Sequence, residues 1–219
     1  MIVHLVDGTY ELYRQHFGQL GRHTDENENA GVIGVLSSTL QLIENGATHI
    51  GVATDHVIES FRNDLWPGYK TSEGMEPEIL RQIPVLEDAL TAMGVTVWAM
   101  TEFEADDALA SAVRVACEDR TVHQVRILTP DKDLGQCVSG RRVVQVDRKN
   151  DVIIDEKGVQ TKFGVGPASI IDYLALVGDS GIDVFRRRLD DDVLALEPCD
   201  KIRRMLRAFD GEGERLFHL

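Results

Sequence analysis

Acidic residues follow each of four short apolar runs in this chain, and their spacing is the first feature that points to chemistry. The runs cover residues 2–6, 48–53, 95–99 and 124–128. One acid in such a place caps a turn or complements the start of a helix. Acids after all four runs would repel one another if they met, unless a cation lay between them. The acids in question are Asp7, Asp55, Glu102, Glu104, Asp106, Asp107, Asp131 and Asp133.

The apolar runs are typical of buried strands, and a fifth covers residues 143–146. Stretches with helical spacing lie between them, at 32–43, 78–93 and 105–117. Strands that alternate with helices of this length predict an α/β fold, with a parallel sheet covered on both faces. Ligands of such sheets bind at the carboxyl ends of the strands. We therefore expect the acids to meet at that edge.

A cluster of carboxylates suits hard cations such as Mg²⁺ or Mn²⁺, whereas Zn²⁺ sites use closely spaced Cys and His. The seven His residues are scattered, without HxH or HxxxH spacing. Two cations about 4 Å apart activate water and stabilise the leaving oxygen of a phosphodiester. No GxSxG, SxxK or P-loop motif offers another route. The acids therefore favour metal-dependent nuclease chemistry.

Several motifs together resemble the 5′-3′ exonuclease family, the flap-endonuclease group that includes the amino-terminal nuclease domain of bacterial DNA polymerase I. The similarity runs from residue 1 to about residue 183. It implies a PIN-like sheet at 1–164 with a helical arch, and a remnant or divergent helical DNA-binding region at 165–219. The motifs are Asp7-Gly8, Leu12-Tyr13-Arg14, Phe61-Arg62, Tyr69-Lys70, Glu104-Ala105-Asp106-Asp107, Asp131-Lys132-Asp133-Leu134 and Leu176-Val177-Gly178-Asp179.

The resemblance also implies a site with two Mg²⁺ ions, which Mn²⁺ can replace, and no organic cofactor. The ligands of the first ion would be Asp7, Asp55, Glu104 and Asp106, with Asp107 acting through water. The second would use Asp131, Asp133 and Asp179, with Asp183 as the least well matched ligand. Lys70 and Asp106 would be catalytic, Lys70 by placing the scissile phosphate.

The implied substrate is DNA with a 5′ end, flap or nick, and a DNA polymerase is the implied partner. The residues expected to contact DNA are Tyr13, Arg14, Arg62, Lys70 and Arg81. For Tyr13, Arg62, Lys70 and Arg81, a role in packing or on a solvated surface is an equally open interpretation.

Two departures from the family pattern bear on DNA binding. Thr71-Ser72-Glu73-Gly74 follows Lys70, where the family usually has a further basic residue. Beyond Asp179 the expected acid position holds Ile182, Asp183 comes one residue later, and no Gly-Pro-Gly turn follows. The expected explanation is a truncated or divergent end. A catalytically weak or inactive module that binds nucleic acid or a partner is the alternative function.

The amino-acid composition argues against several other classes of protein. The 219 residues carry 37 Asp and Glu against 23 Lys and Arg, a net charge of −14, which argues against holding duplex DNA by general charge. Cys117, Cys137 and Cys199 share no CxxC spacing. With no signal-peptide pattern and no apolar run near 20 residues, we expect a cytoplasmic protein that binds no membrane.

Overall fold

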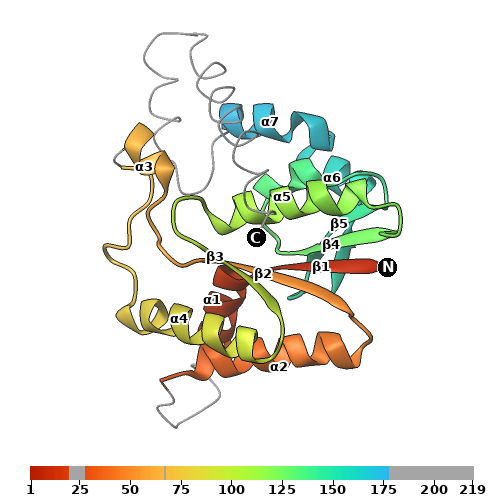
Figure 1. Ribbon diagram of the computed structural model, residues 1–219. Helices are drawn as coiled ribbons and strands as arrows, with labels where there is room; N and C mark the ends of the chain where they lie inside the picture. Colours follow the sequence, from red (N-terminus) through yellow and green to blue (C-terminus); the bar gives the residue numbers. More distant parts are fainter. Residues whose placement is uncertain (20–27, 67, 178–219) are drawn as a thin grey trace. The chain divides into compact units, whose positions relative to one another are not determined.

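The computed structural model describes residues 1–19, 28–66 and 68–177. The chain divides into two compact units, Met1–Ala168 and Ser169–Leu219. The first contains a six-stranded sheet, and the described part of the second contains helix α7 (Figure 1). The strands are β1 (Ile2–Asp7), β2 (His49–Asp55), β3 (Thr96–Met100), β4 (Gln124–Leu128), β5 (Val143–Asp147) and β6 (Val152–Ile154).

Most of the helices lie in the connections between these strands. None of those in the described ranges is long and apolar enough to cross a membrane. They are α1 (Gly8–Gln19), α2 (Ala30–Glu44), α3 (Phe61–Leu65), α4 (Pro77–Ala92), α5 (Ala105–Glu118), α6 (Glu156–Phe163) and α7 (Ile170–Val177), with short 3-10 helices η1 (Asp133–Cys137) and η2 (Pro167–Ser169). Of these, α6, η2 and α7 follow the last strand.

The strand order is β3-β2-β1-β4-β5-β6. Strands β1 to β5 are parallel, which confirms the expected α/β class. Strand β6 pairs antiparallel with β5 and was not expected. It has only three residues, two of them exposed, so it lacks the apolar run that reveals the buried strands. The order reverses between β1 and β4, and ligands bind at such a switch point in α/β sheets.

Each face of the sheet has its own apolar core. Leu5, Val125 and Ile127 pack under α5 on one face. Val6 and Val52 pack against α1, α2 and α4 on the other. Figure 1 shows the two helical layers on opposite sides of the sheet. Alternate residues of β1 point to opposite faces, so this apolar strand is buried on both.

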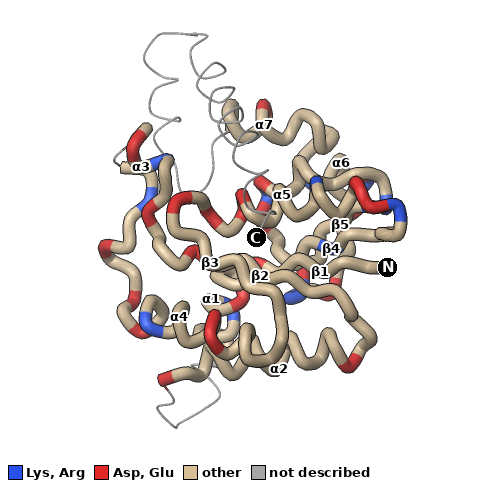
Figure 2. Tube along the Cα trace, in the orientation of Figure 1, with Lys and Arg blue, Asp and Glu red and all other residues tan. Residues whose placement is uncertain are grey.

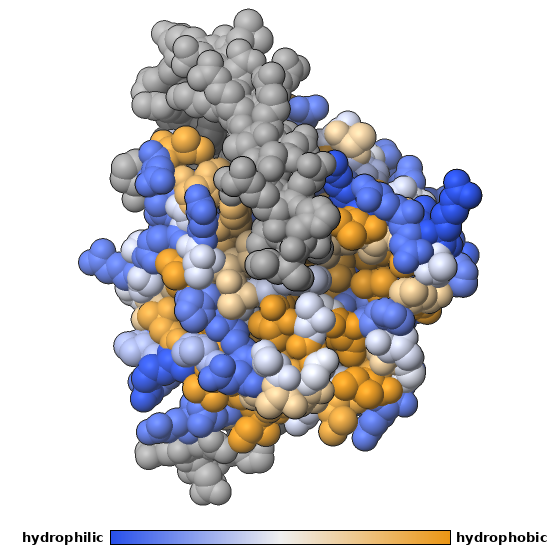
Figure 3. Space-filling view, in the orientation of Figure 1, coloured by the Kyte–Doolittle hydropathy of each residue, from blue (hydrophilic) through white to orange (hydrophobic). Residues whose placement is uncertain are grey.

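Helix α2 is apolar on both of its sides. Val32 and Val35 are buried, whereas Ile33, Leu40 and Ile43 are exposed. Figure 3 shows apolar side chains on the surface over this part of the molecule. The expected helix at 32–43 is confirmed, and it begins two residues earlier and ends one residue later.

Gly8 lets α1 begin directly against β2. A Cβ atom at this position would lie 2.7 Å from Thr54 Cγ2 and 2.9 Å from the carbonyl oxygen of Ala53. Those separations are shorter than real Cβ contacts, so only glycine fits without a shift of the backbone. This close approach places the end of β1, with Asp7, beside the end of β2, with Asp55.

Candidate metal centre

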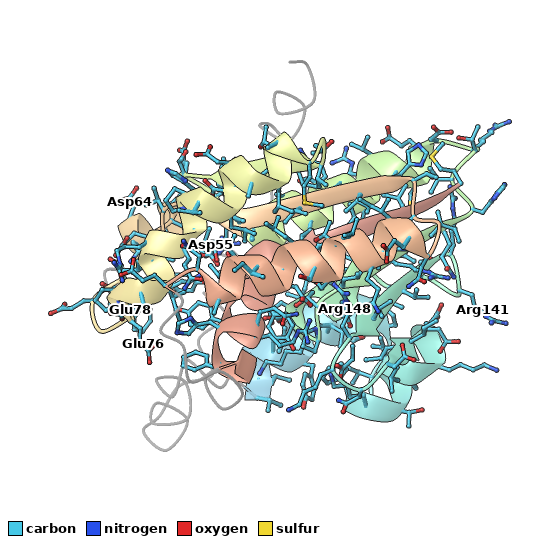
Figure 4. The ribbon with its side chains drawn as sticks, turned by 90° about the horizontal axis from the view of Figure 1, so that it is seen from below. Asp55, Asp64, Glu76, Glu78, Arg141 and Arg148 are labelled. Atoms are coloured by element: carbon cyan, nitrogen blue, oxygen red, sulfur yellow. The ribbon has the colours of Figure 1, made fainter. Side chains whose placement is uncertain are left out.

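Five acids from four chain segments line one cavity of about 320 Å³, together with Lys70. They come from the ends of β1 and β2, the start of α5 and the loop after β4. Figure 4 shows Asp55 at the carboxyl end of the strands and Arg141 at the opposite end. In Figure 2, acidic residues gather around the start of α5 and the segment between α3 and α4. The five acids are Asp7, Asp55, Glu104, Asp106 and Asp131.

Hydrogen bonds fix the two acids at the strand ends. The carboxylate of Asp7 accepts the Tyr10 backbone N–H at 2.8 Å and the Thr129 hydroxyl at 3.1 Å. The carboxylate of Asp55 accepts the Ala105 backbone N–H at 2.8 Å. These donors belong to the start of α1, the loop after β4 and the first residue of α5. Three elements therefore converge on two neighbouring carboxylates.

Lys70 is the cation of the cavity. Its Nζ lies 3.3 Å from Asp55 Oδ2 and 4.0 Å from Glu104 Oε2. Burial favours the neutral amine, but Asp55 and Glu104 outweigh it and raise the pKa of Lys70 above its ordinary value. The other oxygen of Glu104 accepts the Ser60 hydroxyl at 2.7 Å. The site thus holds a lysine that stays charged.

The surrounding protein disfavours the ionised form of two of the acids. Burial, with a smaller contribution from Asp55, raises the pKa of Asp7 to about 7. Burial and then the charges of Asp7 and Asp131 raise the pKa of Asp106 well above its ordinary range. Desolvation and like charge both disfavour the ionised form, and a bound cation would reverse both effects.

The oxygen-rich lining fits a hard divalent cation, because no His or Cys lines the cavity. In the described ranges, no three His, Cys, Asp or Glu side chains converge closely enough to enclose an ion. The carboxylates instead accept hydrogen bonds from the protein, such as that from Lys70 to Asp55. Binding an ion therefore requires some of these bonds to be exchanged for the cation.

Asp107 faces away from the cavity toward Arg62. The two guanidinium nitrogens of Arg62 each lie 2.7 Å from a different oxygen of Asp107. Asp107 also accepts the Glu104 backbone N–H at 2.9 Å, which closes the capping box of α5. Arg62 was expected on DNA and Asp107 near a metal through water. In the structure they pair with each other.

The acids expected for a second ion are only partly brought together. Asp131 lines the cavity, and its carboxylate accepts the Asp133 backbone N–H at 2.8 Å. The Asp133 side chain does not line the cavity, although its charge contributes to the raised pKa of Asp106. Asp179 and Asp183 lie outside the described residues.

The other residues expected to contact DNA have different surroundings. Tyr13 lines the cavity. Arg14 lies 2.6 Å from the buried carboxylate of Glu11. Arg81 is exposed on α4, 3.9 Å from Glu78. Only Tyr13 and Lys70 of the five therefore lie at the cavity.

Sequence reasoning missed several residues that shape the site. The Thr9 hydroxyl accepts the Asp55 backbone N–H at 2.8 Å, and Thr129 binds Asp7. Thr129 directly follows β4 and Thr9 lies two residues beyond the end of β1, and these positions near strand ends were the available signal. Ile58 and Met75 also line the cavity and belong to no motif.

Comparison with known proteins identifies the family. The family model described as "5′-3′ exonuclease, N-terminal resolvase-like domain" matches residues 2–164. The chain belongs to the 5′-3′ exonuclease family. This confirms the resemblance inferred from the motifs at the strand ends.

Proteins similar to this chain include DNA polymerases I and 5′-3′ exonucleases. A thermostable DNA polymerase I of Thermus thermophilus is 34% identical over 80% of this chain and 21% of its own length. The 5′-3′ exonuclease of Aquifex aeolicus is 32% identical over 81% of this chain and 61% of its own length. The chain therefore spans about a fifth of the polymerase and under two thirds of the exonuclease.

Solved structures of the bacteriophage T5 flap endonuclease share the fold. The T5 D15 protein co-crystallised with metal ions aligns with a TM-score of 0.67 at 16% identity, covering 84% of this chain and 69% of that one. A D155K variant in a pseudo-enzyme-product complex with DNA and metal ions gives a TM-score of 0.64 at 19% identity, covering 83% and 68%. The α/β sheet flanked by helices is thus the PIN-like fold of 5′ nucleases.

Proposed function

We propose that this chain is a divalent-metal-dependent 5′ nuclease that hydrolyses phosphodiester bonds of DNA. The observation that carries the proposal is the convergence of Asp7, Asp55, Glu104, Asp106 and Asp131 on one cavity that also holds Lys70. Family membership supports the same chemistry. When bound, divalent cations activate water and neutralise charge on the phosphate and the leaving oxygen.

We propose the following roles for the residues of the cavity. Asp7, Asp55, Glu104 and Asp106 hold a first Mg²⁺, and Asp131 contributes to a second together with Asp133 and Asp179. Lys70 places the scissile phosphate, because its charged Nζ lies among the acids and can exchange Asp55 for a phosphate oxygen. Tyr13 lines the wall of the cavity, where an aromatic ring can stack on an unpaired base.

The proposed substrate is DNA with a 5′ end, flap or nick, and residues 1–164 form the proposed catalytic domain. A DNA polymerase is the proposed partner, since similar proteins carry that name. Residues 165–219 are the proposed DNA-binding region. Arg62 is left out of the proposed DNA contacts because Asp107 holds it.

The decisive experiment is a substrate panel with Mg²⁺ or EDTA. Flap, nicked, blunt and single-stranded DNA are compared with the same structures in RNA, using wild type and Asp106→Asn. We expect Mg²⁺-dependent cleavage of DNA with a 5′ end, reduced more than about 100-fold in Asp106→Asn, since losing even an outer-shell partner of a metal costs about 10- to 100-fold.

Asp88→Asn is the matched control, because Asp88 is exposed on α4 away from the cavity. It should cleave like wild type. Cleavage that survives Asp106→Asn or EDTA would refute the metal-dependent mechanism. DNA binding without cleavage by a folded wild-type protein would favour the inactive binding module instead.

A further inference from the structure

The backbone around Lys70 is held by the side chains of Glu59 and Asn63, which flank the Phe61-Arg62 motif but are not part of it. Asn63 lies in α3, and its Oδ1 accepts the Ser60 backbone N–H at 3.0 Å. The same side chain donates from Nδ2 to the Lys70 carbonyl oxygen at 2.5 Å. One contact needs an acceptor and the other a donor, so the two together fix the orientation of the amide. Asn63 therefore ties the first turn of α3 to Lys70.

Glu59 holds the chain on the other side of Lys70. One oxygen of its carboxylate accepts both the backbone N–H and the hydroxyl of Ser72, each at 2.7 Å. The Thr71 hydroxyl lies 3.4 Å from the same oxygen. The Lys70 carbonyl and the Ser72 N–H are thus both fixed by side chains of residues 59–63.

This anchoring matters because a lysine side chain is long and flexible. Such a side chain samples many rotamers, so a fixed backbone is needed to keep Nζ close to Asp55 and Glu104. Residues 59–63 are also tied to the acids, since the Ser60 hydroxyl donates to Glu104 at 2.7 Å. One short segment therefore sets the spacing between Lys70 and the carboxylates.

We propose that Asn63, assisted by Glu59, is the positioning residue that sets Lys70 at the cavity. The proposal rests on the proposed function for the role of Lys70 on the phosphate. Asn63 touches neither the cavity nor the reacting atoms and acts through the backbone of Lys70.

The first test measures the placement of Lys70 without any substrate. An amine-reactive ester is applied to the full chain, and labelling of Lys70 is read by mass spectrometry against the exposed Lys157 as internal reference. Asn63→Asp keeps the acceptor for the Ser60 N–H but loses the donor to Lys70. We expect Lys70 to label several-fold faster in this variant, because it leaves its partners Asp55 and Glu104.

Two controls accompany the labelling. Asn45→Asp makes the same change at the exposed end of α2 and should leave Lys70 labelling unchanged. Glu59→Gln keeps an acceptor for Ser72 and should label like wild type, whereas Glu59→Ala should label faster. Equal labelling of Lys70 in wild type, Asn63→Asp and Glu59→Ala would overturn the proposal, whether or not the protein cleaves DNA.

The second test is a double-mutant cycle on single-turnover cleavage of a 5′-flap substrate. Asn63→Asp should lower the cleavage rate about 10- to 100-fold with little change in the protein concentration that gives half the maximal rate, as misplacement of a reacting group does. In the Lys70→Ala background it should have no further effect. An equal loss in both backgrounds would overturn the proposal, since Asn63 would then act elsewhere. Absence of cleavage by wild type would refute the proposed function and leave the labelling result to decide.

Discussion

The guanidinium of Arg62 and the carboxylate of Asp107 form a bidentate ion pair, with two N–O distances of 2.7 Å. Both side chains are largely buried, at 17% and 12% exposure. Arg62 also packs over the ring of Phe61, with Cζ 4.7 Å from its centroid. The pair neutralises one acid of the Glu104–Asp107 motif inside the protein and joins α3 to α5. The remaining acids face the cavity.

Breaking this pair should cost stability. We expect Arg62→Ala to lower the free energy of unfolding by about 3 kcal/mol, because it leaves a buried carboxylate without its partner. Arg62→Lys should recover only part of the loss, since an ammonium cannot make two parallel hydrogen bonds. Urea unfolding measures the free energy of unfolding of both variants. Exposed Arg81→Ala is the control and should change stability by less than about 0.5 kcal/mol. Unchanged stability of Arg62→Ala with weakened DNA binding would restore the DNA-contact interpretation.

The raised pKa values of Asp7 and Asp106 predict how the metal-free protein responds to pH. A carboxyl whose pKa is raised in the folded state holds its proton more tightly there than in the unfolded chain. The stability it contributes is present at low pH and lost as the pH rises through the folded pKa. In EDTA, stability should therefore fall between about pH 4 and pH 7, the range from the ordinary Asp value to that of Asp7.

Removing one of these charges should flatten that dependence. Asp106→Asn should raise the thermal midpoint in EDTA near pH 8. If Mg²⁺ binds the folded state as proposed, the variant should also show a smaller further rise on adding Mg²⁺. Thermal denaturation with and without Mg²⁺ measures both effects. Asp88→Asn, at an exposed position of α4, should behave like wild type. If Asp106→Asn is destabilising in EDTA, the acids do not repel one another as inferred.

Gly8 gives a third prediction. Gly8→Ala should destabilise the protein by about 1–3 kcal/mol, because its Cβ would meet Thr54 Cγ2 at 2.7 Å and Val52 Cγ1 at 2.8 Å. Moving α1 away from β2 would also separate Asp7 from Asp55, so a larger Mg²⁺ concentration should be needed for thermal stabilisation. Gly18→Ala is the matched control in the same helix, where a Cβ meets nothing within 4 Å and alanine favours the helix. Equal effects of the two substitutions would contradict the prediction.

Gln145 gives the fourth prediction. This fully buried side chain of β5 donates to the carbonyl oxygen of Asp131 at 2.5 Å and lies 3.4 Å from that of Thr129. Gln145→Met fills a similar volume without the donors, so it should cost about 1–3 kcal/mol for the unsatisfied carbonyl. Because Asp131 is proposed to hold Mg²⁺, the Mg²⁺ concentration for half-maximal thermal stabilisation should rise about tenfold, as it does when the support of a metal ligand is lost. Gln41→Met, at an exposed position of α2, should change neither the stability nor the Mg²⁺ concentration required. A normal Mg²⁺ titration of Gln145→Met would show that Asp131 needs no such support.

The sequence by itself determined the parallel sheet and the edge of the sheet at which the acidic residues lie. Apolar runs ending in Asp7 and Asp55 identified buried parallel strands, because a strand covered on both faces leaves a continuous apolar signal. Acids after four such runs then had to share one edge. The antiparallel strand β6 was not predicted, because it is short and two of its three residues are exposed.

The tertiary structure decided which charged side chains face the cavity. Asp106 and Asp107 are adjacent in the sequence, yet Asp106 lines the cavity and Asp107 pairs with Arg62. Successive residues at the start of a helix point about 100° apart, so their partners depend on what packs against each side. The partner of Asp107, Arg62, lies on α3, 45 residues earlier in the chain. Spacing along the sequence reveals a residue's direction from its own element, but only the packed fold supplies the group it meets.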